Sequence, residues 1–174
     1  MKNPIWLVML TALLPLSAYA GPAGPLSVTE SVEINAPADD VWQSVNDFGD
    51  LGAWHPAVAS TEITEGENNQ PGARRLLTLQ DGGTIDESLE AYDDEGMSFT
   101  YVINEGVLPV SDYRSTITVT STGDDTSTVT WRGDFKRKSM DENPPEGEDD
   151  KTATDTMTAV YRAGLDNLKQ QMEQ

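Results

Sequence analysis

Residues 72–93 read GARRLLTLQDGGTIDESLEAYD, and this stretch decides the fold class. Two alternating segments, 72–80 and 84–93, flank the turn residues DGG, and this pattern is typical of an antiparallel β-hairpin. One face of the hairpin carries mainly apolar side chains and is interrupted by Arg75 and Glu87. Because a lone charge on a buried face is costly, we expect these two side chains to pair.

The turn sets how the two charges meet. A three-residue loop, Asp81–Gly83, is a common hairpin connection. It predicts that Arg75 and Glu87 are diagonal neighbours, with Cα atoms about 7–8 Å apart. Such a pair could fix the strand register, or it could form a polar handle that orients a ligand. A guanidinium neighbour is expected to lower the pKa of Glu87, which weakens a catalytic role for this carboxylate.

The alternation continues on both sides of the hairpin. A helix rich in acidic residues at its start is expected after Pro37, and the apolar stripe in 151–174 predicts one long C-terminal helix. This order predicts an α+β fold, in which a curved antiparallel sheet wraps around the C-terminal helix and leaves a ligand pocket between them. Strands are expected at 28–34, 57–65, 72–80, 84–93, 97–105, 112–121 and 126–137.

Large aromatic side chains share the face that carries the two charges. Tyr101, Tyr113 and Trp131 each have a hydroxyl or N–H that needs a partner when buried. Core packing explains each of them singly, whereas the charges and aromatics together favour a ligand pocket. Leu108 lies in a connection that we expect at the pocket mouth. The predicted ligand-binding residues are Trp54, His55, Arg75, Glu87, Tyr101, Leu108, Tyr113, Trp131 and Phe135.

The segment Trp54-His55-Pro56 holds the only histidine of the chain. A zinc site takes about three or four ligands, usually several of them His or Cys, and this chain has no cysteine, so we expect no metal site. A nucleophilic serine in a Gly-x-Ser-x-Gly elbow is also absent from the sequence. His55 is therefore either an acid–base residue acting with Glu87 or a packed, pocket-lining imidazole, and we favour the second interpretation.

Residues 1–20 have the pattern of a secretory signal peptide. Lys2 precedes an apolar core of about 12 residues, which is shorter than the ~20 that a membrane-spanning helix needs. The stretch ends in Ala-Tyr-Ala, a small-x-small cleavage pattern, so we predict cleavage after Ala20. A linker at 21–27 and one domain at 28–174 would follow. Since exported proteins without cysteine fit a bacterial periplasm well, we expect a periplasmic protein that is not inserted in the membrane after cleavage.

The net charge of the chain is −19. Such a surface repels nucleic acid and anionic headgroups over a Debye length of about 8 Å, so a nucleic-acid partner is not expected. A basic periplasmic protein would be attracted by the same charge. The charge could also serve solubility alone.

Six fragments in order resemble the polyketide cyclase/dehydrase and lipid-transport family of the START/Bet v 1-like (SRPBCC) superfamily. They are VEINAPADDVWQSVNDFGDLGAWHP, GARRLLTLQDGGTIDESLEAYD, SFTYVI, LPVSDYRSTITV, VTWRGDF and YRAGLDNLKQ, and they cover about residues 28–172. The chain is similar to exported bacterial members in particular. The resemblance implies the helix-grip fold, with a deep cavity between sheet and helix that binds hydrophobic or amphipathic molecules.

The resemblance also limits the function. Some family members catalyse cyclisation or dehydration, but an exported protein would not meet carrier-bound polyketides. We therefore expect non-enzymatic binding of a small apolar or amphipathic molecule, without a cofactor. The alternatives are a cyclase or dehydratase that uses His55 and Glu87 as acid–base residues, and an accessory protein that docks a periplasmic redox partner through its acidic surface.

Overall fold

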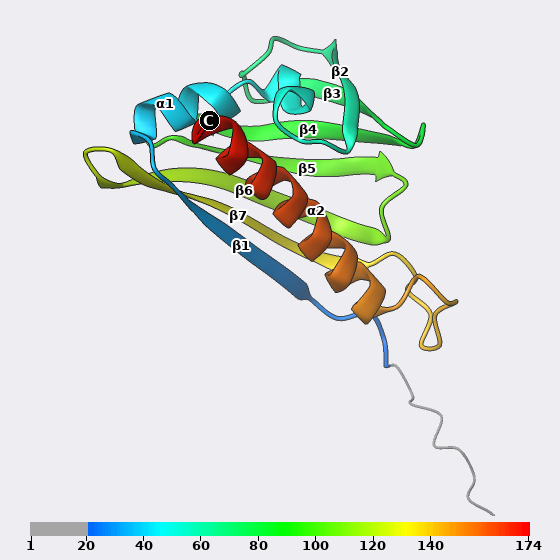
Figure 1. The fold of residues 1–174 in the computed structure, drawn as a ribbon. Coiled ribbons are helices and arrows are strands. Elements are labelled where there is room, and N and C mark those ends of the chain that lie inside the picture. Colours follow the sequence, from blue (N-terminus) through cyan, green and yellow to red (C-terminus); the bar gives the residue numbers. More distant parts are fainter. Residues whose placement is uncertain (1–20) are drawn as a thin grey trace, which may run out of the picture.

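The computed structural model describes residues 21–174, so the predicted signal peptide at 1–20 lies outside the described residues. One antiparallel sheet bends around a long C-terminal helix (Figure 1), which confirms the predicted α+β arrangement. The strand order is β1-β7-β6-β5-β4-β3-β2. The elements are β1 (Leu26–Ile34), α1 (Ala38–Val45), the 3-10 helix η1 (Phe48–Ala53), β2 (Val58–Glu65), β3 (Arg74–Leu79), β4 (Thr84–Asp93), β5 (Ser98–Gly106), β6 (Val110–Gly123), β7 (Thr126–Arg137) and α2 (Asp150–Met172).

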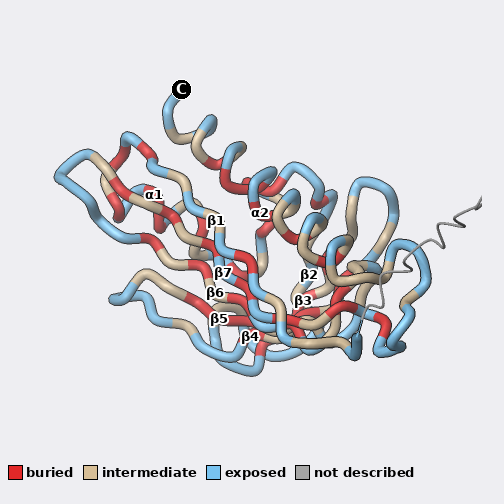
Figure 2. Tube along the Cα trace, turned by 90° about the horizontal axis from the view of Figure 1, so that it is seen from below, coloured by how far each residue is buried: buried red, intermediate tan, exposed pale blue. Residues whose placement is uncertain are grey.

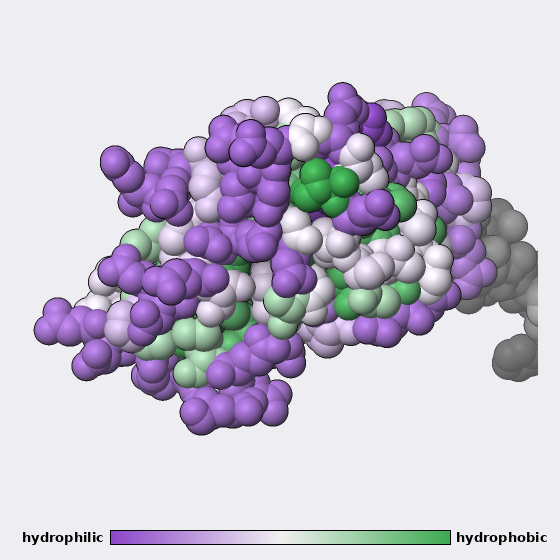
Figure 3. All heavy atoms as spheres, turned by 90° about the horizontal axis from the view of Figure 1, so that it is seen from above, coloured by the Kyte–Doolittle hydropathy of each residue, from purple (hydrophilic) through white to green (hydrophobic). Residues whose placement is uncertain are grey.

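The observed strands lie within a few residues of the predicted ones. The start of β1 differs, because Leu26 and Ser27, which the sequence pattern assigned to a linker, already pair with Phe135 and Asp134 of β7. The two short helices α1 and η1 connect β1 at one edge of the sheet to β2 at the other. Hydrophilic side chains cover most of the face seen in Figure 3, as the acidic composition requires.

Helix α2 lies across the concave side of the sheet. Its N-terminus is capped by Asp149, whose carboxylate accepts a hydrogen bond of 2.7 Å from the backbone N–H of Thr152. One face of the helix is buried against the sheet (Figure 2). No helix among residues 21–174 is long and apolar enough to cross a membrane. The buried positions of α2 are Ala153, Met157, Tyr161, Gly164, Leu165 and Leu168.

Gly164 lets α2 approach the sheet closely. A Cβ atom at this position would lie 2.6 Å from Cδ2 of His55 and 3.0 Å from ring carbons of Trp54 and Trp131. These distances are shorter than van der Waals contact, so any larger residue would push the helix away. The helix backbone therefore rests on three rings, and this contact fills much of the space between sheet and helix.

The register of the β3–β4 hairpin differs from the prediction. Arg75 lies directly opposite Glu87, not diagonal to it, and the last paired residues are Thr78 and Thr84. The loop therefore has five residues, Leu79–Gly83, in place of the predicted three. It is closed by a hydrogen bond of 2.8 Å from the Leu79 N–H to the Gly83 carbonyl. The prediction was wrong because turn composition alone did not show how many residues the loop takes from β3.

Candidate ligand-binding site

A cavity of about 70 Å³ lies between the sheet and α2. It is far smaller than the deep cavity that the resemblance implied. An apolar cavity of about 150 Å³ admits benzene, so a cavity half that size has no room for an aromatic ring. Its walls include Leu51, His55, Leu77, Ile85, Glu87, Tyr101, Ile103, Leu108, Tyr113, Trp131, Met157 and Val160.

Aromatic packing explains why so little space remains. The ring of Trp131 stacks on that of Tyr161, with centroids 4.5 Å apart and planes inclined by 14°. Trp54 meets Trp131 edge-on at 5.5 Å. Because Gly164 lets α2 settle onto these rings, the aromatic residues themselves fill the interior.

Arg75 and Glu87 form a buried ion pair at the wall of this cavity. Nε and Nη2 of Arg75 both lie 2.6 Å from Oε2 of Glu87, and Nη1 donates to the carbonyl of Phe48 at 2.6 Å. The guanidinium also lies 4.1 Å from the centroid of the Phe48 ring and 5.2 Å from that of Tyr101. All three nitrogens of Arg75 are thus held, and the expected pairing of the two charges is confirmed.

Arg75 contacts one oxygen of the Glu87 carboxylate. Its hydrogen bond from Nε and its ion-pair contact from Nη2 both go to Oε2. Burial raises the pKa of Glu87 from its ordinary value, although the neighbouring Arg75 lowers it. The guanidinium thus lowers this pKa as expected, but desolvation of the carboxylate outweighs its effect, so the net shift is upward.

A network of hydroxyl groups lies beside the cavity, and three of its members, Tyr101, Tyr113 and Trp131, line it. The Tyr113 and Tyr161 hydroxyls are 2.6 Å apart, and Tyr101 lies 3.4 Å from Tyr113. The indole N–H of Trp131 donates to Tyr101 at 3.1 Å and to Ser115 at 2.9 Å. Burial raises the pKa of Tyr161 to about 12 and raises that of Tyr101 further, so these hydroxyls stay protonated.

His55 is buried and both of its ring nitrogens are engaged. Nδ1 accepts a hydrogen bond of 3.3 Å from the Ala57 N–H, so the proton resides on Nε2, which lies 3.0 Å from the Val160 carbonyl. Burial lowers the pKa of His55, which keeps the imidazole neutral. The ring also meets Trp131 edge-on at 5.9 Å. This geometry matches the packed imidazole that lines the pocket.

Six of the nine predicted site residues line the cavity: His55, Glu87, Tyr101, Leu108, Tyr113 and Trp131. The other three support them from behind. Arg75 holds Glu87, Trp54 packs on Trp131, and Phe135 stacks on Tyr113 with centroids 6.1 Å apart.

The sequence-based site set omitted two residues of the hydroxyl network. Ser115 is buried and also donates to the Arg132 carbonyl at 2.8 Å. Its position as a polar residue between Tyr113 and Ile117 on an apolar strand face was the available signal. Tyr161 lies on the apolar stripe of the predicted helix at 151–174, and its hydroxyl on that stripe was a similar signal.

A metal site does not form among residues 21–174, where no group of three or more His, Asp or Glu side chains could hold an ion. The candidate site consists of a mainly apolar cavity whose lining includes Glu87, Tyr101 and Tyr113.

Comparison with known proteins places this geometry in a family. The family described as polyketide cyclase/dehydrase and lipid transport matches residues 25–173. The chain belongs to this family. The curated MLP-like protein 423 of Arabidopsis thaliana is 29% identical over 133 residues, which are 72% of this chain and 84% of the relative.

Two solved structures show the same architecture. XoxI from Bacillus cereus is 33% identical, with a TM-score of 0.73 over 84% of this chain and 95% of that one. The ZhuI aromatase/cyclase from Streptomyces sp. R1128 is 19% identical, with a TM-score of 0.69 over 86% of this chain and 94% of that one. The latter likeness shows the fold alone. The fold of this family member is thus the Bet v 1-like helix grip, as the resemblance implied.

Proposed function

We propose that this family member is an exported, non-enzymatic protein that binds a small hydrophobic or amphipathic molecule. The observation that carries the proposal is the cavity between the sheet and α2, where the ion-paired Glu87 lies among mainly apolar and aromatic side chains. Such a lining, with a few polar groups, is typical of small-molecule sites. The apolar side chains would receive the hydrocarbon part of a ligand.

The contacts of the two candidate acid–base residues argue against catalysis. Both nitrogens of His55 are engaged within the protein, so the ring has no free lone pair for a substrate proton. Glu87 is held by two bonds from Arg75. The likeness to an aromatase/cyclase at 19% identity extends to the fold and gives no support for its activity.

The proposed binding is tested by native mass spectrometry of the chain purified from its own host. A bound species that leaves on mild denaturation is the expected result. A chain that carries no co-purifying small molecule, and that takes up none from a lipid extract of the host, would refute the proposal.

The proposed export has its own test. N-terminal sequencing of the protein from a periplasmic extract should begin at Gly21, because cleavage after Ala20 is predicted. Intact protein recovered only from the cytoplasm would refute export without touching the binding proposal.

A further inference from the structure

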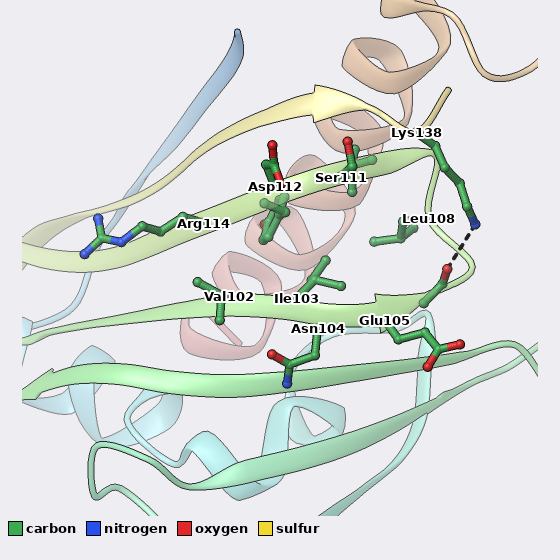
Figure 4. Close-up of a pocket in the computed structure, with 12 residues that line it drawn as sticks. Val102, Ile103, Asn104, Glu105, Leu108, Ser111, Asp112, Arg114 and Lys138 are labelled. Carbon is green, nitrogen blue, oxygen red and sulfur yellow. Dashed lines mark hydrogen bonds between the residues drawn. The ribbon is translucent and has the colours of Figure 1, made fainter. Parts of the chain in front are cut away.

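Strands β5 and β6 separate toward the loop that connects them. They are paired from Ser98 opposite Thr118 to Val102 opposite Arg114, and no pair follows toward the connecting loop. Each strand keeps its other neighbour: Gly106 of β5 still pairs with β4, and Val110 of β6 still pairs with β7. Figure 4 shows the two strands diverging toward the loop. The sheet therefore has an opening within it, flanked by intact pairs on both sides.

A bulge in β6 accounts for the separation. The pairing of β6 with β7 shifts between Ser111 and Arg114, and within this bulge Asp112 has a φ of 48°. A non-glycine residue rarely adopts this left-handed conformation. The Asp112 carboxylate is held by Lys136 of β7 at 2.8 Å. Bulges bend the strand that carries them, so this one directs β6 away from β5.

The opening holds a groove of about 730 Å³, which lies within the size range of small-molecule sites. Ile103, Leu108 and Tyr113 line both this groove and the cavity beneath the sheet. The two hollows thus adjoin one another across these three side chains. Since the inner cavity measures only about 70 Å³, a drug-sized ligand can fit only if most of it lies in the groove.

The charged side chains around the groove sum to a net charge of zero. Arg114 pairs with Glu90 at 2.6 Å, and Asp112 pairs with Lys136. Within residues 21–174, Glu105 and Lys138 have no ion-pair partner, and their opposite charges cancel. The protein as a whole carries −19, which repels anions. These charges favour a neutral ligand.

The ends of the groove exclude an extended peptide. A peptide that adds to a sheet edge runs along an open strand. Here the β5–β6 pairs close one end of the opening, and the short loop between Gly106 and Val110 closes the other. The loop is tied to Lys138, directly after β7, which donates from Nζ to the Gly106 carbonyl at 3.2 Å and from its backbone N–H to the Pro109 carbonyl at 3.0 Å. A peptide strand would have to thread through the closed ring of backbone that β5, β6 and their connecting loop form.

We propose that the ligand is a neutral amphipathic small molecule whose bulk lies in the groove between β5 and β6. Its apolar end passes between Ile103, Leu108 and Tyr113 into the inner cavity, and its polar part stays at the outer rim. This inference rests on the proposed binding function and adds the ligand's location and charge class. It differs from a site between sheet and helix alone.

The test uses two probes that differ by one sulfonate: the neutral dye N-phenyl-1-naphthylamine and its anionic analogue 1-anilinonaphthalene-8-sulfonate. The chain has no cysteine, so Asn104→Cys, an exposed position at the groove, can be labelled alone with biotin maleimide. Thr122→Cys, exposed in the distant β6–β7 hairpin, is the matched control. Urea midpoints check that both labelled proteins remain folded.

The label at position 104 should weaken binding of the neutral dye by at least about tenfold, and the label at 122 by less than about twofold. The anionic dye should bind the unlabelled chain at least about tenfold more weakly than the neutral dye. Equal binding by the two labelled proteins would overturn the groove and leave the binding function standing. Equal affinity for the two dyes would overturn the neutral class, and failure of the unlabelled chain to bind either dye would overturn the inference together with the proposed function.

Discussion

Removal of either partner of the buried Arg75–Glu87 pair should cost stability, but the two costs should differ. Glu87→Leu leaves an arginine that is 1% exposed and cannot lose its proton, so the variant should lose about 3–5 kcal/mol of unfolding free energy. Arg75→Met leaves a carboxyl group that can take up a proton. Its cost should be smaller, about 1–3 kcal/mol, because the residual group is neutral and only its hydrogen bonds are lost.

The pH dependence of Arg75→Met follows from the same chemistry. Burial already raises the pKa of Glu87, and removal of the guanidinium takes away the opposing influence. A group whose pKa is raised on folding contributes stability below its unfolded pKa and loses that contribution as the pH rises through the folded value. The deficit of Arg75→Met relative to the wild type should therefore shrink as the pH is lowered, whereas that of Glu87→Leu should not.

Urea unfolding followed by tryptophan fluorescence measures these free energies. The double variant Arg75→Met/Glu87→Leu should cost less than the two single variants together, with a coupling of about 2 kcal/mol or more. Additive costs would refute the account of a coupled pair. Equal costs for the two single variants, at neutral and at acidic pH alike, would refute the assigned difference in their protonation.

Three further outcomes test the packing and the protonation of the interior. Gly164→Ala should lower the unfolding free energy by about 1–3 kcal/mol despite the better helix propensity of alanine, because its Cβ meets the rings beneath it. The control Ala163→Gly, at the neighbouring exposed position, should lose only about 1 kcal/mol. A stabilised Gly164→Ala would contradict the close approach of helix and rings. The imidazole of His55 should titrate in NMR spectra with a midpoint below 6.5, since burial lowers its pKa. Its contribution to stability is then present above pH 6.5 and is lost as the pH falls through the pKa of the folded state. A midpoint at or above 6.5 would disprove the assigned environment. Tyr161→Phe should cost about 1–2 kcal/mol in urea unfolding, because Tyr113 loses its 2.6 Å partner; an unchanged midpoint would show that the hydroxyl network adds no stability.

Side-chain periodicity was enough to predict the inward face of the sheet. Tyr101, Tyr113 and Trp131 are all buried on the face that alternation assigned to them, and the charges at 75 and 87 pair there. Period-2 alternation is a local property of extended backbone, so it can be followed strand by strand without knowledge of the tertiary contacts.

The size of the cavity could not be predicted in this way. It depends on how closely α2 packs on the sheet. Because Gly164 has no side chain, the helix can approach three rings that lie far from it in the sequence. The opening between β5 and β6 was hidden for a similar reason. It depends on the left-handed backbone of Asp112, and one aspartate within an alternating strand pattern does not by itself indicate a bulge.

The most direct test of the account is a crystal structure of the chain grown with N-phenyl-1-naphthylamine. We predict density for the dye in the groove between β5 and β6, in contact with Ile103, Leu108 and Tyr113, with its N–H or its ring edge directed toward the inner cavity. Dye density confined to another surface, or a β5–β6 groove that stays empty at saturating dye, would contradict it.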